Sequence, residues 1–293
     1  MIKTPRIQPL QSFSVNKNIE VDVLRLDEIH PIVSGNKWYK LKYYLQDAIE
    51  KKCSTIITFG GAFSNHIVAT AFACKANNLK SIGIIRGEES KQLSATLIAA
   101  KSYGMELHFV ERSFYKTKQI PASINQNNDY IIAEGGYGKL GSKGVASIFE
   151  NMNIEKYTHI ICACGTGTTL AGIVAAALPH QKIIGINALK GYEKIDEDIK
   201  QILPENFVNN AFEINNNYHF NGYAKYNATL INFMNELWQI ENLPTDFVYT
   251  GKLFYAIKDM IAKNYFEENS KLIVVHSGGL QGNKSLANGM LMF

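Results

Sequence analysis

The sequence of 293 residues has little cysteine, little proline and little charge of either sign. Its four cysteines, Cys53, Cys74, Cys162 and Cys164, are too few and too irregularly spaced for a disulfide framework. No two of them form the Cys-x-x-Cys pair of a zinc ribbon, and no metal site is predicted. We interpret them as small apolar side chains in a reducing compartment.

Charged residues make up 19% of the chain, and 30 Lys and Arg against 26 Asp and Glu leave a net charge of +4. There is no long basic cluster, so nucleic-acid binding is not predicted. The uncharged stretch 160–178 is long enough to span a membrane, but glycines and threonines divide it into two apolar blocks. A buried strand followed by a buried helix explains it better. The first residues also lack the apolar run of a signal peptide, so we expect a cytoplasmic protein without membrane contact.

Apolar residues are abundant, at 46%, and alternate between short runs and helical spacing. Strands are predicted over 55–59, 81–85, 106–110, 129–133, 157–162, 182–186 and 272–275. Helices are predicted over 38–48, 65–78 and 93–104, and the Asn-rich stretch 206–221 is predicted to be a loop. The alternation predicts an α/β fold with mostly parallel sheets, in which ligands bind beyond the carboxyl ends of the strands.

Three junctions between a predicted strand and the segment after it are rich in glycine. In the first, Gly60 and Gly61 precede Ser64-Asn65 at a helix start, where a simple helix cap is the alternative to an anion site. In the second, 165–169 reads Gly-Thr-Gly-Thr-Thr and offers the amides, hydroxyls and helix dipole of a phosphate cradle. It is neither a Walker A loop nor a complete dinucleotide fingerprint. A tight turn that binds no ligand is the alternative interpretation. The third junction, 275–282, is by itself only weak evidence for a ligand site.

Lys37 follows a Gly-Asn pair and opens the first predicted helix. A lysine in such a place is usually a solvated charge. Beside a phosphate cradle, however, it suggests a cofactor that carries both a phosphate and an aldehyde. Pyridoxal phosphate fits, because a lysine amine forms a Schiff base with it.

With these motifs in this order, the chain resembles the pyridoxal-phosphate enzymes of fold type II, and among them the group of D-cysteine desulfhydrases and 1-aminocyclopropane-1-carboxylate (ACC) deaminases. Three residues, Ser34, Tyr39 and Phe247, depart from the glycine, arginine and proline of the family motifs. The matching segments are 5–10, 35–41, 60–66, 165–169, 244–252 and 276–279.

The resemblance implies cofactor contacts for most of the matched residues. Lys37 would be the Schiff-base lysine and, once freed, the general base. Asn65 would bind the ring hydroxyl of the cofactor, and Thr250 would be the neutral partner of its pyridine nitrogen. Lys40 matches the family's second lysine. The phosphate would be held by Gly165, Thr166, Gly167, Thr168 and Thr169.

The resemblance also implies a set of residues at the substrate. Ser64 would lie near the substrate carboxylate, and Tyr249 would stand close to the reacting atoms. Tyr223 is a weaker match to a second catalytic tyrosine, and ordinary packing is the alternative for both tyrosines. The expected substrate contacts are Ser64, Asn65, His66 and Tyr249.

Thr250 and His66 indicate which of the family's reactions to expect. By the resemblance, ACC deaminases have a glutamate directly after the tyrosine and a glutamine at the histidine position, whereas D-cysteine desulfhydrases have Thr and His. We therefore expect β-elimination from a small amino acid, most simply D-cysteine to pyruvate, sulfide and ammonia. ACC deamination to 2-oxobutyrate and a pyridoxal-phosphate-binding protein with little turnover are the alternatives, and a dinucleotide-dependent oxidoreductase is a more distant one.

For the architecture, the resemblance implies two open, mostly parallel αβα domains of the tryptophan synthase β type, with the cofactor in the cleft between them. The smaller domain is predicted over 41–135. The larger combines 1–40 with 136–293. The family expectation for assembly is a homodimer.

Overall fold

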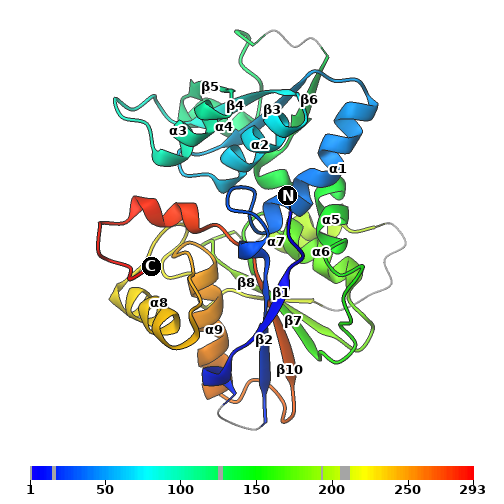
Figure 1. Cartoon of the computed structure of the whole chain (residues 1–293), viewed down its shortest axis with the longest axis vertical. Coiled ribbons are helices and arrows are strands. Elements are labelled where there is room, and N and C mark those ends of the chain that lie inside the picture. Colours follow the sequence, from blue (N-terminus) through cyan, green and yellow to red (C-terminus); the bar gives the residue numbers. More distant parts are fainter. Residues whose placement is uncertain (1, 15–17, 125–127, 193, 205–211) are drawn as a thin grey trace.

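A computed structural model describes residues 2–14, 18–124, 128–192, 194–204 and 212–293 and contains two β-sheets (Figure 1). The larger sheet has the strand order β1-β2-β10-β7-β8-β9. Its β1 pairs antiparallel with β2, and every other pair in it is parallel. Its strands are β1 (Arg6–Pro9), β2 (Glu20–Arg25), β7 (His159–Cys164), β8 (Lys182–Asn187), β9 (Phe212–Asn215) and β10 (Lys271–His276).

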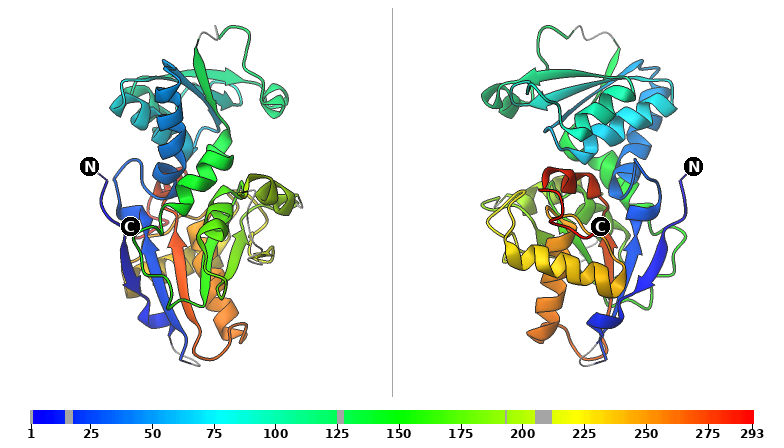
Figure 2. Two further views of the ribbon diagram at one scale, coloured as in Figure 1. Left: turned by 90° about the vertical axis from the view of Figure 1, so that its right-hand side faces the viewer. Right: turned by 60° about the vertical axis from the view of Figure 1, so that its left-hand side comes forward.

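Helices cover both faces of this larger sheet (Figures 1 and 2). Its central strands are continuous apolar runs, which is what burial on two faces requires. One face packs against α8 (Ala228–Glu241) and α9 (Thr250–Ala262). The opposite face packs against α5 (Lys139–Ala146), α6 (Thr168–Ala176) and α7 (Ile195–Ile202).

The smaller sheet is parallel throughout and has the strand order β5-β4-β3-β6. It is flanked by α1 (Asn36–Glu50) and α2 (Asn65–Ala76), together with α3 (Ala95–Ser102) and α4 (Arg112–Thr117). Helix α1 also contacts α5, which links this part of the molecule to the larger sheet. Its strands are β3 (Thr55–Gly60), β4 (Lys80–Arg86), β5 (Met105–Val110) and β6 (Asp129–Ile132).

The predicted fold class is confirmed, and each predicted strand is present within about two residues of its expected bounds. The prediction for 206–221 was wrong in part, because Phe212–Asn215 forms β9 by pairing with β8. Positions 206–211 lie outside the described residues. The uncharged stretch 160–178 is divided between β7 and α6, as expected.

Across the described ranges, no helix is long and apolar enough to cross a membrane. In the same ranges, no three His, Cys, Asp or Glu side chains are grouped as a metal site would require.

Candidate active site

A cavity of about 500 Å³ lies where strands of both sheets end. The loops after β3, β7 and β10 contribute to its lining, as does the start of α1. The parallel topology explains this position, because it brings the carboxyl ends of distant strands to one edge. Ten of the predicted site residues line the cavity: Lys37, Ser64, Asn65, His66, Gly165, Thr166, Gly167, Thr169, Tyr223 and Tyr249. Thr168 and Thr250 are buried behind the lining.

Lys37 is held in place by its neighbour in the sequence. Its Nζ donates a hydrogen bond to Asn36 Oδ1 at 3.0 Å, and Asn36 Nδ2 donates to Thr169 Oγ1 at 2.8 Å. Burial lowers the pKa of the Lys37 amine to about 8, and the charge of Asp246 partly opposes this shift. A substantial fraction of the amine is therefore neutral at pH 7–8, as a nucleophile or a base requires.

Lys40 and His66 lie on the inner side of the cavity. Burial, followed by repulsion from Lys37, holds the pKa of Lys40 well below its usual range. Burial has the same effect on the pKa of His66, whose Nε2 lies 2.8 Å from Thr58 Oγ1. Because the Thr58 hydroxyl donates its proton to the Ile132 carbonyl, His66 Nε2 must carry the hydrogen in this contact. His66 Nδ1 is thus a buried acceptor that has no hydrogen-bond partner among the described residues.

Ser64 and Asn65 begin α2 beside this group. Ser64 occupies the N-cap position, but its side chain makes no capping hydrogen bond, so the simple cap does not account for its hydroxyl. Asn65 Nδ2 donates to the Gly279 carbonyl at 3.2 Å, and the buried Oδ1 has no partner within the part of the chain that the structure describes. A buried oxygen without a hydrogen-bond partner on the wall of a cavity is a position at which a ligand donor is expected.

The glycine loop between β7 and α6 forms another wall. Gly167 is the N-cap of α6 with φ of +80°, and a Cβ there would come within 2.6 Å of Ile199. At Gly165, a Cβ would come within 3.0 Å of the Tyr249 hydroxyl oxygen. Position 167 therefore requires glycine, and a side chain at Gly165 would crowd Tyr249. The two glycines leave the backbone amides unhindered at a helix N-terminus and suited to an anion.

Tyr249 and Tyr223 close the cavity near this loop. Their rings meet edge to face, with centroids 6.1 Å apart, and 46% of Tyr223 remains exposed. Burial, together with the neighbouring Tyr223, raises the pKa of Tyr249 well above its ordinary value. The Tyr249 phenol therefore keeps its proton at neutral pH and can donate it there, but it cannot act as a general base.

Asp246 organises the start of α9 behind these tyrosines. Its Oδ1 accepts hydrogen bonds from the amides of Val248 and Tyr249 at 2.9 and 2.8 Å. Its Oδ2 accepts from the Thr250 amide at 3.0 Å and from the Thr250 hydroxyl at 2.7 Å. The Thr250 hydroxyl proton is thus directed to Asp246 and away from the cavity. The predicted contact between Thr250 and a ring nitrogen stays a prediction.

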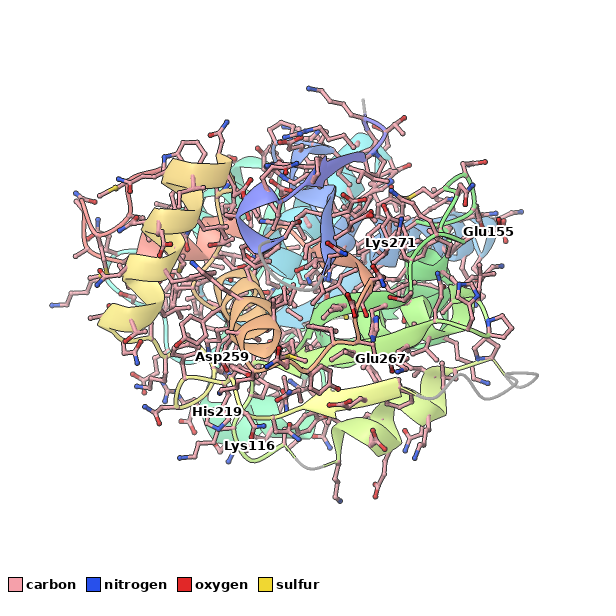
Figure 3. The ribbon with its side chains drawn as sticks, turned by 90° about the horizontal axis from the view of Figure 1, so that it is seen from below. Lys116, Glu155, His219, Asp259, Glu267 and Lys271 are labelled. Carbon is pink, nitrogen blue, oxygen red and sulfur yellow. The ribbon has the colours of Figure 1, made fainter. Side chains whose placement is uncertain are left out.

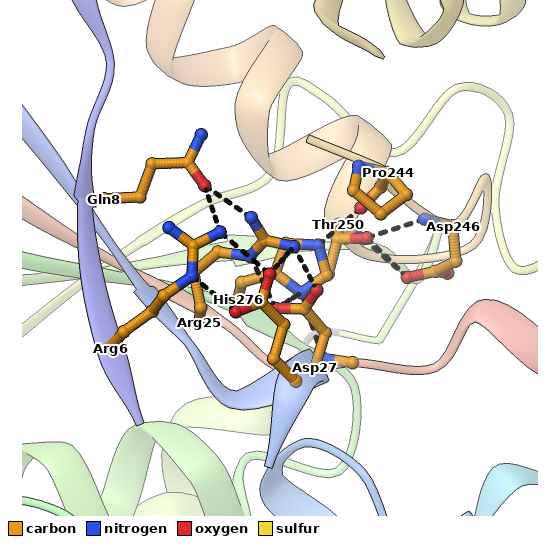
Figure 4. A network of polar contacts seen from close by, with 10 residues as sticks. Arg6, Gln8, Arg25, Asp27, Pro244, Asp246, Thr250 and His276 are labelled. Carbon is orange, nitrogen blue, oxygen red and sulfur yellow. Dashed lines mark hydrogen bonds and ion pairs between the residues drawn. The ribbon is translucent and has the colours of Figure 1, made fainter. Parts of the chain in front are cut away.

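A buried polar network supports the cavity from the side of β2 and β10 (Figure 4). His276 Nε2 donates to the Pro244 carbonyl at 2.8 Å, and its Nδ1 lies 3.3 Å from Asp27 Oδ1. Asp27 is paired in turn with Arg25 at 2.7 Å. Burial opposes the charge of Asp27, but His276 and Arg25 hold the pKa of this carboxyl below its usual range. The network fixes the segment before α9 relative to the loop after β10.

Sequence reasoning assigned no role to three residues of this region. Arg86 and Glu134 line the cavity at the ends of β4 and β6, and the rule that ligands bind beyond strand ends could have found both. Asp246 lies in a matched motif, but its role depends on a helix start that only the fold shows.

Comparison with known proteins identifies the family of this chain. The family described as pyridoxal-phosphate dependent enzyme matches residues 3–278. This chain belongs to that family. The cofactor is therefore pyridoxal phosphate and the protein is an enzyme, and the two parallel-sheet domains are those of fold type II.

Individual members of the family resemble the chain over most of its length. A Thermotoga maritima protein is 30% identical over 96% of this chain and 95% of its own, and its name gives ACC deaminase as a provisional activity. The mitochondrial bifunctional D-cysteine desulfhydrase/ACC deaminase of Arabidopsis thaliana is 29% identical over 85% of this chain and 70% of its own. A solved ACC deaminase homologue is 28% identical, with a TM-score of 0.83, and the match covers 96% of this chain and 91% of the other.

The residues on the cavity wall fit this cofactor. The buried Lys37 amine, with its lowered pKa, suits an aldehyde, and the Gly165–Gly167 backbone at the start of α6 suits a phosphate. The orphaned Asn65 oxygen suits a ring hydroxyl.

Proposed function

We propose that this enzyme catalyses β-elimination from a small amino acid, with D-cysteine giving pyruvate, sulfide and ammonia. The observation that carries the proposal is the neutral Thr250 directly after Tyr249, at the position where the resemblance places a glutamate in ACC deaminases. Asp246, the carboxylate that contacts Thr250, is already engaged by four donors. Without a free acid at this position, loss of a thiolate is favoured over opening of a cyclopropane, which has no comparable leaving group.

The residues proposed to hold the cofactor surround the inner half of the cavity. Lys37 would bind it covalently, and Asn65 would bind its ring hydroxyl. The backbone of Gly165–Thr169 would hold the phosphate at the start of α6. When bound, pyridoxal phosphate supplies an electron sink for negative charge at Cα of the substrate.

Two side chains are proposed to move protons. Lys37, with its lowered pKa, would accept the proton from Cα. Tyr249, whose pKa is raised, would donate a hydrogen bond or a proton to the leaving sulfur. Ser64 would bind the substrate carboxylate, since its hydroxyl is not used as a helix cap. The Tyr223 and Tyr249 rings would limit the access of water.

Product analysis tests the proposal directly. The purified enzyme, loaded with pyridoxal phosphate, is incubated separately with D-cysteine, L-cysteine and ACC, with Lys37→Ala as the control. Pyruvate and sulfide from D-cysteine, absent with Lys37→Ala, are expected. Turnover of L-cysteine alone would contradict the proposed enantiomer.

ACC deamination is the second candidate, because the names of similar proteins include this activity. Release of 2-oxobutyrate from ACC, without sulfide from D-cysteine, would show that Thr250 does not decide the reaction. Cofactor binding without a keto acid from any of the three substrates would favour a binding protein with little turnover.

The predicted domain division, the homodimer and the cytoplasmic location remain proposals. The strands of the smaller sheet lie between 55 and 132, inside the proposed 41–135 domain, which supports the division. Amide hydrogen exchange would test it, because 41–135 should open as one cooperative unit, and sedimentation would test the dimer.

A further inference from the structure

Helix α9 carries a stripe of side chains, Tyr249, Lys252, Tyr255 and Asp259, at spacings of three and four residues, which place them along one face. The first of these closes the cavity. The others face a loop, 218–224, which ends at the cavity-lining Tyr223 and Ala224. The sequence analysis gave none of the last three a role, although Lys252 ends the matched segment 244–252.

The loop runs along this stripe in the opposite direction. The Tyr218 hydroxyl donates to Asp259 Oδ2 at 2.7 Å. One helical turn nearer the cavity, the Phe220 and Tyr255 rings meet edge to face at 5.0 Å. Figure 3, which labels His219 and Asp259, shows the loop beside α9 from below.

Lys252 makes the central contact of this arrangement. The side chain is fully buried, and its Nζ donates to the carbonyl oxygens of His219 at 2.9 Å and Gly222 at 2.8 Å. The same two carbonyls accept the amides of Gly222 and Lys225, so each is shared between a loop turn and the ammonium. Its partners here are carbonyl dipoles of the loop and not a carboxylate.

The loop needs such support because its backbone is unfavourable. Phe220, Asn221 and Ala224 have φ of +48°, +67° and +52°, a region that residues with a side chain rarely adopt. Gly222 between them has φ of +118°. A segment with this backbone persists only where its surroundings hold it.

We infer that α9 acts as a template for the 218–224 loop, and that the buried ammonium of Lys252 is the positioning group that holds Tyr223 against Tyr249 at the cavity. The inference rests on the proposed function only in taking Tyr223 as an active-site residue. Lys252 itself is a positioning residue, since its contacts are with the loop. One helix would thus set the place of both tyrosines, Tyr249 through its own first turn and Tyr223 through Lys252.

Amide hydrogen exchange of the cofactor-free protein tests the template without any turnover. Peptides covering 217–227 are compared in the wild type, Lys252→Gln and Lys252→Met. Loss of the charged hydrogen bonds is expected to speed exchange in this peptide by about tenfold or more. Lys258→Gln is the matched control, because Lys258 lies on the same helix but is exposed and paired with Glu236. Unchanged exchange in folded Lys252 variants would overturn the inference.

If the Lys252 variants do not fold, the wild type supplies the test. Burial lowers the pKa of Lys252 to about 8, partly opposed by Asp246. Exchange in 217–227, normalised to peptides of α8, is then expected to rise between pH 7 and pH 9.5, as the ammonium loses its proton. The other titratable groups at these contacts are His219, Tyr218, with a raised pKa, and Asp259, with a lowered one. A constant normalised rate would overturn the inference.

A double-mutant cycle separates positioning from general stability. Lys252→Gln is expected to lower kcat more than it raises KM, and to have little further effect when Tyr223 is already Phe. Additive losses would mean that Lys252 acts elsewhere. Absence of turnover in the wild type would contradict the proposed function and leave the exchange result to decide the template.

Discussion

Lys37→Met is expected to stabilise the cofactor-free protein, and to do so more at neutral than at alkaline pH. Burial lowers the pKa of this amine from 10.5 to about 8, so the unfolded chain binds the proton more tightly than the folded one. By linkage, the folded protein is destabilised fully below about pH 8, and the effect disappears as the pH rises to 10.5. Methionine is similar in size and carries no charge.

The magnitude follows from the two pKa values. At about 1.4 kcal/mol per pKa unit, the difference between 10.5 and about 8 corresponds to at most about 3 kcal/mol, because water in the cavity screens the charge. Methionine also leaves Asn36 Oδ1 without its donor, which offsets the gain by about 1–2 kcal/mol at every pH. The gain at pH 7 should therefore exceed the gain at pH 9.5 by up to about 2 kcal/mol.

Thermal unfolding of the cofactor-free wild type and Lys37→Met at pH 7 and pH 9.5 measures this difference. The shift in Tm should be larger at pH 7 by up to about 4 °C. Lys91→Met, which replaces an exposed lysine, should shift Tm little and equally at both pH values. A Lys37→Met shift that does not change with pH would refute the reasoning, since it would mean that the amine is not desolvated.

Three further predictions follow from the same contacts. Pyridoxal phosphate uptake by the cofactor-free enzyme, followed by absorbance, should be half-maximal near pH 8, because only the neutral Lys37 amine is nucleophilic; a midpoint near 10.5 would contradict the role of burial. Asp246→Asn should lower the free energy of unfolding by about 2–3 kcal/mol, because an amide nitrogen cannot accept the hydrogen bonds of Thr250, and an unchanged Tm would contradict this. Gly35→Ala should weaken pyridoxal phosphate binding about tenfold in a titration, because Gly35 has φ of +69° and a Cβ there would overlap the Ser277 carbonyl oxygen. Wild-type affinity in that variant would show that α1 and the loop after β10 can separate freely.

The sequence determined the central strands and the motif residues, because both depend on local chemistry. The β-branched runs that became β3, β7 and β10 are apolar enough to be recognised without any partner. β2 was not predicted because three of its six residues are charged, and β9 lies in an Asn-rich segment. Such strands exist through pairing with distant neighbours, which no local pattern contains.

The site divides in the same way. Lys37, Asn65 and the Gly165–Thr169 loop could be named from motifs, since each needs a particular residue beside a turn or a helix start. Motifs could not predict the lowered pKa of Lys37 or the hydrogen bond from the Thr250 hydroxyl to Asp246. They also could not predict the contact of Lys252 with a loop 30 residues away in the sequence. Burial and hydrogen bonding depend on which distant segments surround a group, and only the tertiary structure decides that.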